Sequence, residues 1–140
     1  MEKRLWWLRD HANATGKREV RKHYERLPDE AQAAFDVHWE LLRVRPRSDW
    51  RRPEAAKLKP EHKNGSRDLF EFRFAAGRKQ QRPLGFFGPA PDEFTLLIWA
   101  IEKGSVFDPH DAVAISEKRL AAVNEGRAAS VPWDDDEIGK

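Results

Sequence analysis

Three short apolar segments, separated by turn-forming residues, constrain the fold of this chain more than any other feature. They occupy residues 69–75, about 82–87, and 94–102, and the linking sequences are "AGRKQQ" and "GPAPDE". Glycine, proline and short polar residues between apolar segments of this length predict tight turns. The sequence therefore predicts an antiparallel meander. Its third segment is apolar at nearly every position, which indicates burial on both faces and a central place in the sheet.

The first of these segments alternates between aromatic and charged residues. Phe70, Phe72 and Phe74 stand at every second position, with Glu71 and Arg73 between them. Successive side chains of a strand point to opposite faces, so the phenylalanines should face a core. Glu71 and Arg73 should then face solvent.

Helical patterns surround the meander. Residues 17–26 and 27–45 have helical spacing of apolar residues, and Pro28 suits the first position of the second helix. A last helix is expected between Asp108, a possible cap, and Gly126. A first strand is expected within "RLWWLR". The fold class is therefore α+β: a four-stranded, mainly antiparallel sheet, with two N-terminal helices on one face and a C-terminal helix beside it.

The length of 140 residues suits one domain, which we place at residues 1–127. Residues 128–140 are acidic and expected to be disordered, either solvated or folded back on basic surface. The chain has no cysteine, and its longest apolar run has eight residues, where a membrane span needs roughly twenty. We expect a cytoplasmic protein that does not contact a membrane.

Charge is distributed unevenly. Residues 43–82 hold thirteen Lys or Arg and five Asp or Glu, a net charge of +8, whereas residues 128–140 carry −3. Much of the positive charge lies in 46–67, which has little periodicity and predicts a long loop. A concentrated basic surface favours phosphate-rich partners such as nucleic acid, although basic loops are also commonly solvated.

Common enzyme motifs are absent. The sequence has no HExxH, no closely spaced histidine pair and no G-x-S-x-G, so neither a metal site nor a cofactor is expected. RNA can be cut without a metal, because its own 2′-OH attacks the adjacent phosphate when a protein orients it and stabilises the added charge.

The order of these elements resembles the RelE/ParE toxin superfamily, closest to its HigB-like, phage-related branch. The resemblance covers about residues 4–125 and rests on "LPDEAQ", "DLFEFRF", "QRPLGFFGP", "FTLLIWAIEKG" and "DPHDAVAISEKRL" in this order. It implies a toxin of a type II toxin-antitoxin system, which cleaves mRNA on the ribosome and is neutralised by a cognate antitoxin. Two alternatives remain: a ParE-like gyrase-poisoning toxin, and a catalytically inactive RNA-binding or interaction module.

The resemblance also implies roles for individual residues. Arg73 and Arg82 match basic positions that bind phosphate and stabilise the transition state, whereas Glu71 occupies a position that is often basic. No tyrosine lies near the last helix, so His62 and His110 are the candidate proton carriers, if they are not solvated bystanders. The expected RNA-binding residues are Arg51, Arg52, Lys57, Lys59, Lys63, Arg67, Arg78, Lys79 and Lys103.

Overall fold

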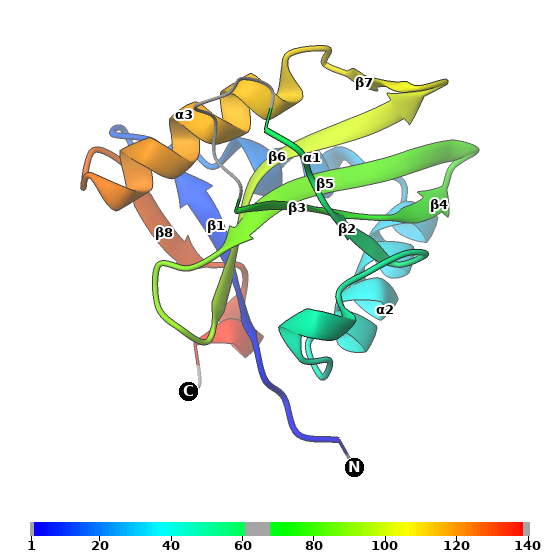
Figure 1. The fold of residues 1–140 in the computed structure, drawn as a ribbon, viewed down its shortest axis with the longest axis horizontal. Coiled ribbons are helices and arrows are strands. Elements are labelled where there is room, and N and C mark those ends of the chain that lie inside the picture. The colour runs from blue at the N-terminus through cyan, green and yellow to red at the C-terminus, as the bar shows by residue number, and fades with distance from the viewer. Residues whose placement is uncertain (1, 61–67, 139–140) are drawn as a thin grey trace.

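The computed structural model describes residues 2–60 and 68–138, and this part of the chain folds as three α-helices and one mixed sheet of eight strands (Figure 1). The α+β class is thus as expected, but the sheet has eight strands where the sequence predicted four. The helices are α1 Glu19–Arg26, α2 Asp29–Leu42 and α3 Ala112–Asn124. The strands are β1 Trp7–Ala12, β2 Ala55–Lys57, β3 Leu69–Phe72, β4 Phe74–Ala76, β5 Lys79–Phe87, β6 Glu93–Lys103, β7 Val106–Asp108 and β8 Ala129–Pro132.

The expected meander forms the middle of the sheet. The strand order is β2-β3-β5-β6-β1-β8, with β4 also paired to β5 and β7 to β6. β3, β5 and β6 are antiparallel neighbours, whereas β1 pairs with β6 in parallel, which makes the sheet mixed. β6 is central and buried from Glu93 to Ala100, as its apolar sequence predicts.

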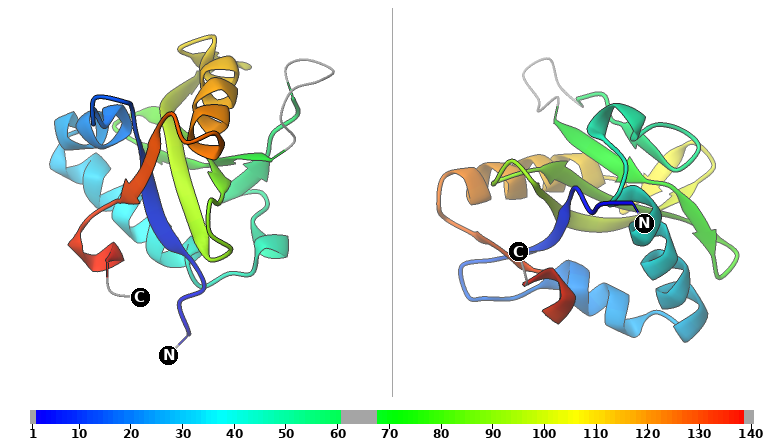
Figure 2. Two further views of the ribbon diagram at one scale, coloured as in Figure 1. Left: turned by 90° about the vertical axis from the view of Figure 1, so that its left-hand side faces the viewer. Right: turned by 90° about the horizontal axis from the view of Figure 1, so that it is seen from below.

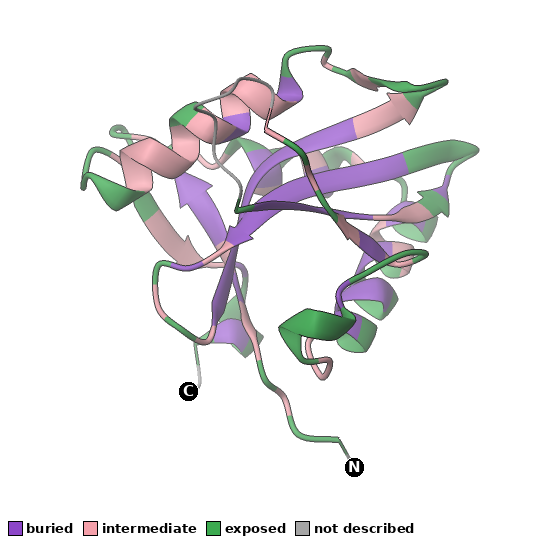
Figure 3. Cartoon of the chain, in the orientation of Figure 1, coloured by how far each residue is buried: buried purple, intermediate pink, exposed green. Residues whose placement is uncertain are grey.

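Helices cover both faces of the sheet (Figure 2). α1 and α2 pack on one face, where Phe35 of α2 contacts an aromatic core that includes Phe72 and Trp99. α3 packs on the other face, against Leu84 and Ile98. The C-terminal helix therefore does not lie beside the sheet, because it buries part of the face that was expected to be free. Figure 3 shows burial along β3 and along most of β5 and β6, whereas the start of β5 is exposed and the end of β6 is only partly buried.

Two connections contain more regular structure than their sequences indicate. The expected loop at 46–67 contains a 3₁₀ turn, Arg47–Asp49, and strand β2, which pairs with β3. Residues 61–67 of this segment lie outside the described residues. The expected start of the last helix instead forms β7, and α3 begins at Ala112. Strands of three residues are too short to show an alternating pattern, so the sequence does not reveal them.

The acidic C-terminal segment is folded, and the expectation of a disordered tail is wrong for residues 129–138. Strand β8 pairs antiparallel with β1. Trp133 is 3% exposed and packs edge-on against Tyr24. The free energy gained by burying a large indole offsets the conformational entropy lost when the short segment that carries it becomes ordered.

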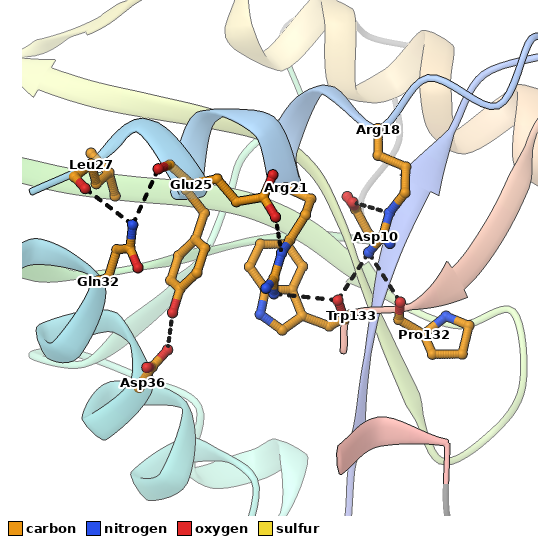
Figure 4. Close-up of polar contacts among 10 residues, drawn as sticks. Asp10, Arg18, Arg21, Glu25, Leu27, Gln32, Asp36, Pro132 and Trp133 are labelled. Carbon is orange, nitrogen blue, oxygen red and sulfur yellow. Dashed lines mark hydrogen bonds and ion pairs between the residues drawn. The ribbon is translucent and has the colours of Figure 1, made fainter. Parts of the chain in front are cut away.

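Arg18, just before α1, and Arg21, within it, hold this segment in place (Figure 4). One guanidinium nitrogen of Arg18 donates to the carbonyl oxygens of Pro132 and Trp133, each at 3.0 Å, and Arg21 donates to the Trp133 carbonyl at 3.3 Å. The Nε of Arg18 also donates to the buried carboxylate of Asp10 at 2.9 Å.

The 3₁₀ turn Asp135–Glu137 completes the anchor. The buried Glu137 carboxylate accepts from the Leu8 backbone N–H at 2.7 Å and from the Trp39 indole at 3.1 Å. Residues 129–138 are therefore an integral part of the sheet and core. Across the described residues, none of the helices has the length and apolar character needed to span a membrane.

A candidate anion-binding site on the sheet

Two arginines, two glutamates and one glutamine from neighbouring strands meet on the face of the sheet that carries α3. We call this group the Arg–Glu cluster: Glu71, Arg73, Gln80, Arg82 and Glu102. Alternation explains the shared face, because Arg82 stands two residues before Leu84, which packs under α3. In the pairing of the strands, Glu71 of β3 lies opposite Leu84 of β5, and Gln80 of β5 lies opposite Glu102 of β6.

Arg82 is the centre of the cluster. Its Nε donates to Glu102 Oε1 at 2.8 Å and lies 3.7 Å from Glu71 Oε2. Its two terminal nitrogens donate to the Gln81 carbonyl at 2.8 Å and to the Gln80 amide oxygen at 3.2 Å. The Arg82 side chain is only 5% exposed, so it is enclosed and does not lie on an open sheet surface. Carboxylates on both neighbouring strands make this burial possible.

Arg73 lies at the outer side of the cluster, in the break between β3 and β4. In this break, the Arg73 backbone N–H donates to the Glu54 carbonyl at 2.8 Å. Its Nη1 donates to Glu71 Oε1 at 2.8 Å and lies 3.8 Å from Glu102 Oε1. The side chain is 16% exposed, so Arg73 retains access to solvent.

Glu71 is buried between the two arginines, which corrects the expectation that it faces water. Burial raises the pKa of its carboxyl above the usual value, and Arg73 and then Arg82 partly oppose this shift. Its Oε2 has no hydrogen-bond partner among the described residues and lies 3.7 Å from the Arg82 Nε. A carboxyl with a raised pKa in a charged cluster is a candidate for proton transfer.

The cluster has no net charge when all its groups are ionised, because two guanidinium groups face two carboxylates. Arg73 and Arg82 contact the same two carboxylates, so their charge is already compensated. An anion can bind strongly here only if a carboxylate moves away or takes up a proton.

Several expected RNA-binding residues are exposed but lie apart from the cluster. Lys79 alternates with Gln80 and Arg82, so it points to the opposite face. There burial lowers the pKa of His23, and the charges of Arg26 and then Lys79 add to this shift. Lys103 forms an exposed ion pair with Asp108 at 3.1 Å. Other exposed members of the predicted set stand at the turn before β5 and along the β2 edge: Arg78, Lys57 and Lys59.

Arg51 and Arg52 form a second basic region. They line a surface hollow of about 370 Å³ together with Arg45, Asp49 and Glu54. This hollow is joined to the cluster through the backbone, because Glu54 accepts from the Arg73 N–H.

Of the two candidate proton carriers, His110 is the one that lies among the described residues. His110 is exposed in the turn before α3 and makes no hydrogen bond or ion pair with the cluster in the described part of the chain. His62 lies outside the described residues, as do Lys63 and Arg67.

Sequence reasoning missed two groups of polar residues. Glu102 was not singled out, although its spacing from Ala100 and its register with Gln80 place it beside Arg82. His11 and His23 are the second group: each has a ring nitrogen without a hydrogen-bond partner in the described structure, and burial lowers the pKa of both. His23 stacks on Trp99 at 5.4 Å, on the face away from the cluster.

Within residues 2–60 and 68–138, no three histidine or acidic side chains are grouped so that they could hold a metal ion. Comparisons with protein-family models, with curated proteins and with solved structures give no significant match to this chain.

Proposed function

We propose that this chain is a metal-independent endoribonuclease toxin of the RelE/ParE type, which cleaves mRNA on the ribosome and is neutralised by a cognate antitoxin. The observation that carries the proposal is the convergence of Arg73 and Arg82 on one face of a rigid sheet. Two guanidinium groups so placed suit a phosphodiester whose negative charge increases during cleavage.

The order of the elements supports the same proposal. A strand, two helices, the antiparallel strands β3, β5 and β6, and a last helix follow one another as the resemblance implies. The basic segment 43–82 contributes both arginines of the cluster and the exposed Arg51 and Arg52, which suit contact with a large polyanion such as ribosomal RNA.

The proposed reaction needs three operations. The 2′-oxygen forms a bond to the adjacent phosphorus while the bond from phosphorus to the 5′-oxygen breaks, leaving a 2′,3′-cyclic phosphate and a 5′-hydroxyl. Arg73, the more exposed arginine, stabilises the negative charge added to the phosphate, and the more deeply buried Arg82 contributes to the same stabilisation. A base takes the 2′-OH proton, and an acid protonates the leaving 5′-oxygen. His110 and His62 remain the candidates for these proton transfers.

A second candidate function is a binding module without catalytic activity. It is favoured by one specific observation: both arginines of the cluster are compensated by carboxylates. A gyrase-poisoning protein of the ParE type would belong to this class, because it needs no acid or base.

Induced expression in a bacterial host separates these functions. The nuclease predicts growth arrest with cuts inside reading frames, mapped by primer extension, and loss of both effects in Arg73→Ala. Arg127→Ala is the matched control, because Arg127 is an exposed arginine paired with Glu125 at 3.2 Å, far in sequence from the cluster. Arrest without mRNA cuts, together with inhibited supercoiling by gyrase, would support the ParE-like alternative. Normal growth at verified soluble expression would reject a toxin of either kind.

A further inference from the structure

The two carboxylates of the Arg–Glu cluster lie at different depths. The Glu71 side chain is 6% exposed, whereas that of Glu102 is 27% exposed. Glu71 is therefore held within the protein, between Arg73 and Arg82. Glu102 contacts the same two arginines from the side that water reaches.

The contacts of Glu102 are those of a bound anion. A single oxygen, Oε1, accepts from Arg82 Nε at 2.8 Å and lies 3.8 Å from Arg73 Nη1. The shorter distance is that of a charge-assisted hydrogen bond, and guanidinium groups bind phosphate oxygens with the same geometry as carboxylate oxygens. A phosphate oxygen placed at Oε1 would therefore satisfy both arginines equally well.

Glu102 can leave this position more easily than Glu71 can. It stands near the end of β6, one residue before the exposed Lys103, so its carboxylate can rotate into water. Glu71 cannot become hydrated without opening the sheet face, because it is enclosed and flanked by buried residues of β3. An ionised group that moves from a protein contact into water recovers its solvation, which offsets part of the lost ion pair.

We propose that Glu102 occupies the site of an RNA phosphodiester, and that RNA binds by displacing this carboxylate while Glu71 keeps both arginines in place. The inference rests on the proposed function for its ligand, single-stranded RNA. It makes Glu102 an internal competitor and Glu71 a positioning residue. Removing the competitor should therefore strengthen RNA binding.

The test is fluorescence anisotropy with a short, 5′-labelled single-stranded RNA. Glu102→Gln should lower Kd about tenfold, since a neutral amide competes less well for a guanidinium than a carboxylate does. Asp108→Asn is the matched control: it removes one negative charge from the neighbouring strand β7, where Asp108 pairs with Lys103 and not with the cluster. This variant should change Kd by less than about twofold, as expected for a screened surface charge.

A second variant excludes a simple effect of net charge. Glu102→Asp keeps the charge but shortens the side chain by one methylene, so its carboxylate reaches Arg82 less well and RNA should bind about threefold more tightly. Unfolding in urea verifies that each variant is folded. Equal gains for Glu102→Gln and Asp108→Asn, or unchanged affinity for both Glu102 variants, would overturn the inference.

Cleavage by the wild type, measured on the same RNA and on programmed ribosomes, tests the proposed function separately. If the wild type cleaves RNA but neither Glu102 variant changes RNA affinity, the proposed nuclease function stands and the competitor role of Glu102 is rejected. If Glu102→Gln binds RNA more tightly but no variant cleaves it, the competitor role stands and the nuclease function is rejected. If no folded variant binds RNA, the competitor role is rejected.

Discussion

Burial decides what Arg82 can do. Its guanidinium is enclosed between β3 and β6 and bonded to Glu102, Gln80 and a backbone carbonyl before any ligand arrives. Such pre-organisation favours transition-state binding, because the group need not be ordered during the reaction. It also means that Arg82 supports the fold itself.

Arg82→Ala should therefore destabilise the protein by about 3 to 5 kcal/mol, because it leaves the buried Glu71 carboxylate without one partner and frees Glu102 from its shortest contact. Urea unfolding measures this difference. Arg127→Ala, at an exposed position, should change the free energy of unfolding by less than about 0.5 kcal/mol. A loss for Arg82→Ala as small as that of the control would show that the buried ion pairs do not stabilise the fold.

Asp10 provides a second test at this scale. It is fully buried in β1, and its pKa is raised to about 6 because burial disfavours the carboxylate more than Arg18 and then Arg21 favour it. The folded state therefore binds this proton more tightly than the unfolded chain, whose reference value is 3.8. The stabilisation from this proton is complete below the lower value and is lost as pH rises through the upper one.

Asp10→Asn lacks this proton equilibrium. Relative to the variant, the wild type should gain about 2 kcal/mol of stability when pH falls from roughly 7 to 4. Urea unfolding of both proteins across this range gives the difference, in which the shifts of all other groups cancel. A difference that does not depend on pH would contradict the raised pKa.

Among the secondary-structure elements, strand β3 shows how far sequence patterns reach. Alternation correctly predicts that Phe70 and Phe72 enter the core, and the same pattern places Glu71 on the other face. It does not reveal that this second face is also covered, because coverage depends on where the distant α3 packs. The sequence therefore singles out the two arginines of the cluster, but it reveals neither the burial of Glu71 nor the contacts of Glu102.

The C-terminal segment shows the opposite limit. Its acidic composition indicates a solvated tail, yet β8 pairs with β1, and Trp133 enters the aromatic core beside Phe35. The burial of one large side chain and the pairing of one edge strand stabilise this segment in spite of the acidic composition of its thirteen residues. Local composition cannot register either contact, because both partners lie more than 90 residues away.

Trp133→Ala should cost about 3 to 5 kcal/mol, because it leaves a cavity between α1 and α2. Ile138→Ala is the matched control in the same segment, since Ile138 is largely exposed, and it should cost less than about 0.5 kcal/mol. Thermal or urea unfolding distinguishes the two. Equal free energies of unfolding for the two variants would show that this segment does not contribute to the stability of the fold.

On the scale of the whole molecule, the layers keep opposite charges apart. The acidic turn Asp135–Glu137 is anchored against β1 and α2, whereas the Arg–Glu cluster lies on the α3 face of the sheet. The C-terminal acids therefore do not compete for the cluster. Competition comes instead from Glu102, within the sheet.

This arrangement combines a basic segment that favours contact with RNA and a compensated arginine pair that favours a phosphate only after an exchange. In the proposed function, a large RNA assembly supplies the attraction through many exposed cations, while the cluster acts on one phosphodiester. The proposed nuclease should therefore be strongly active on ribosome-bound mRNA and weakly active on short free RNA.

The proposed function is tested most directly by incubating the purified chain with ribosomes programmed with a 5′-labelled mRNA. We expect discrete cuts within codons on the ribosome by the wild type and by Arg127→Ala, and none by a folded Arg73→Ala. Intact mRNA with the wild type, or unchanged cutting by Arg73→Ala, would contradict it.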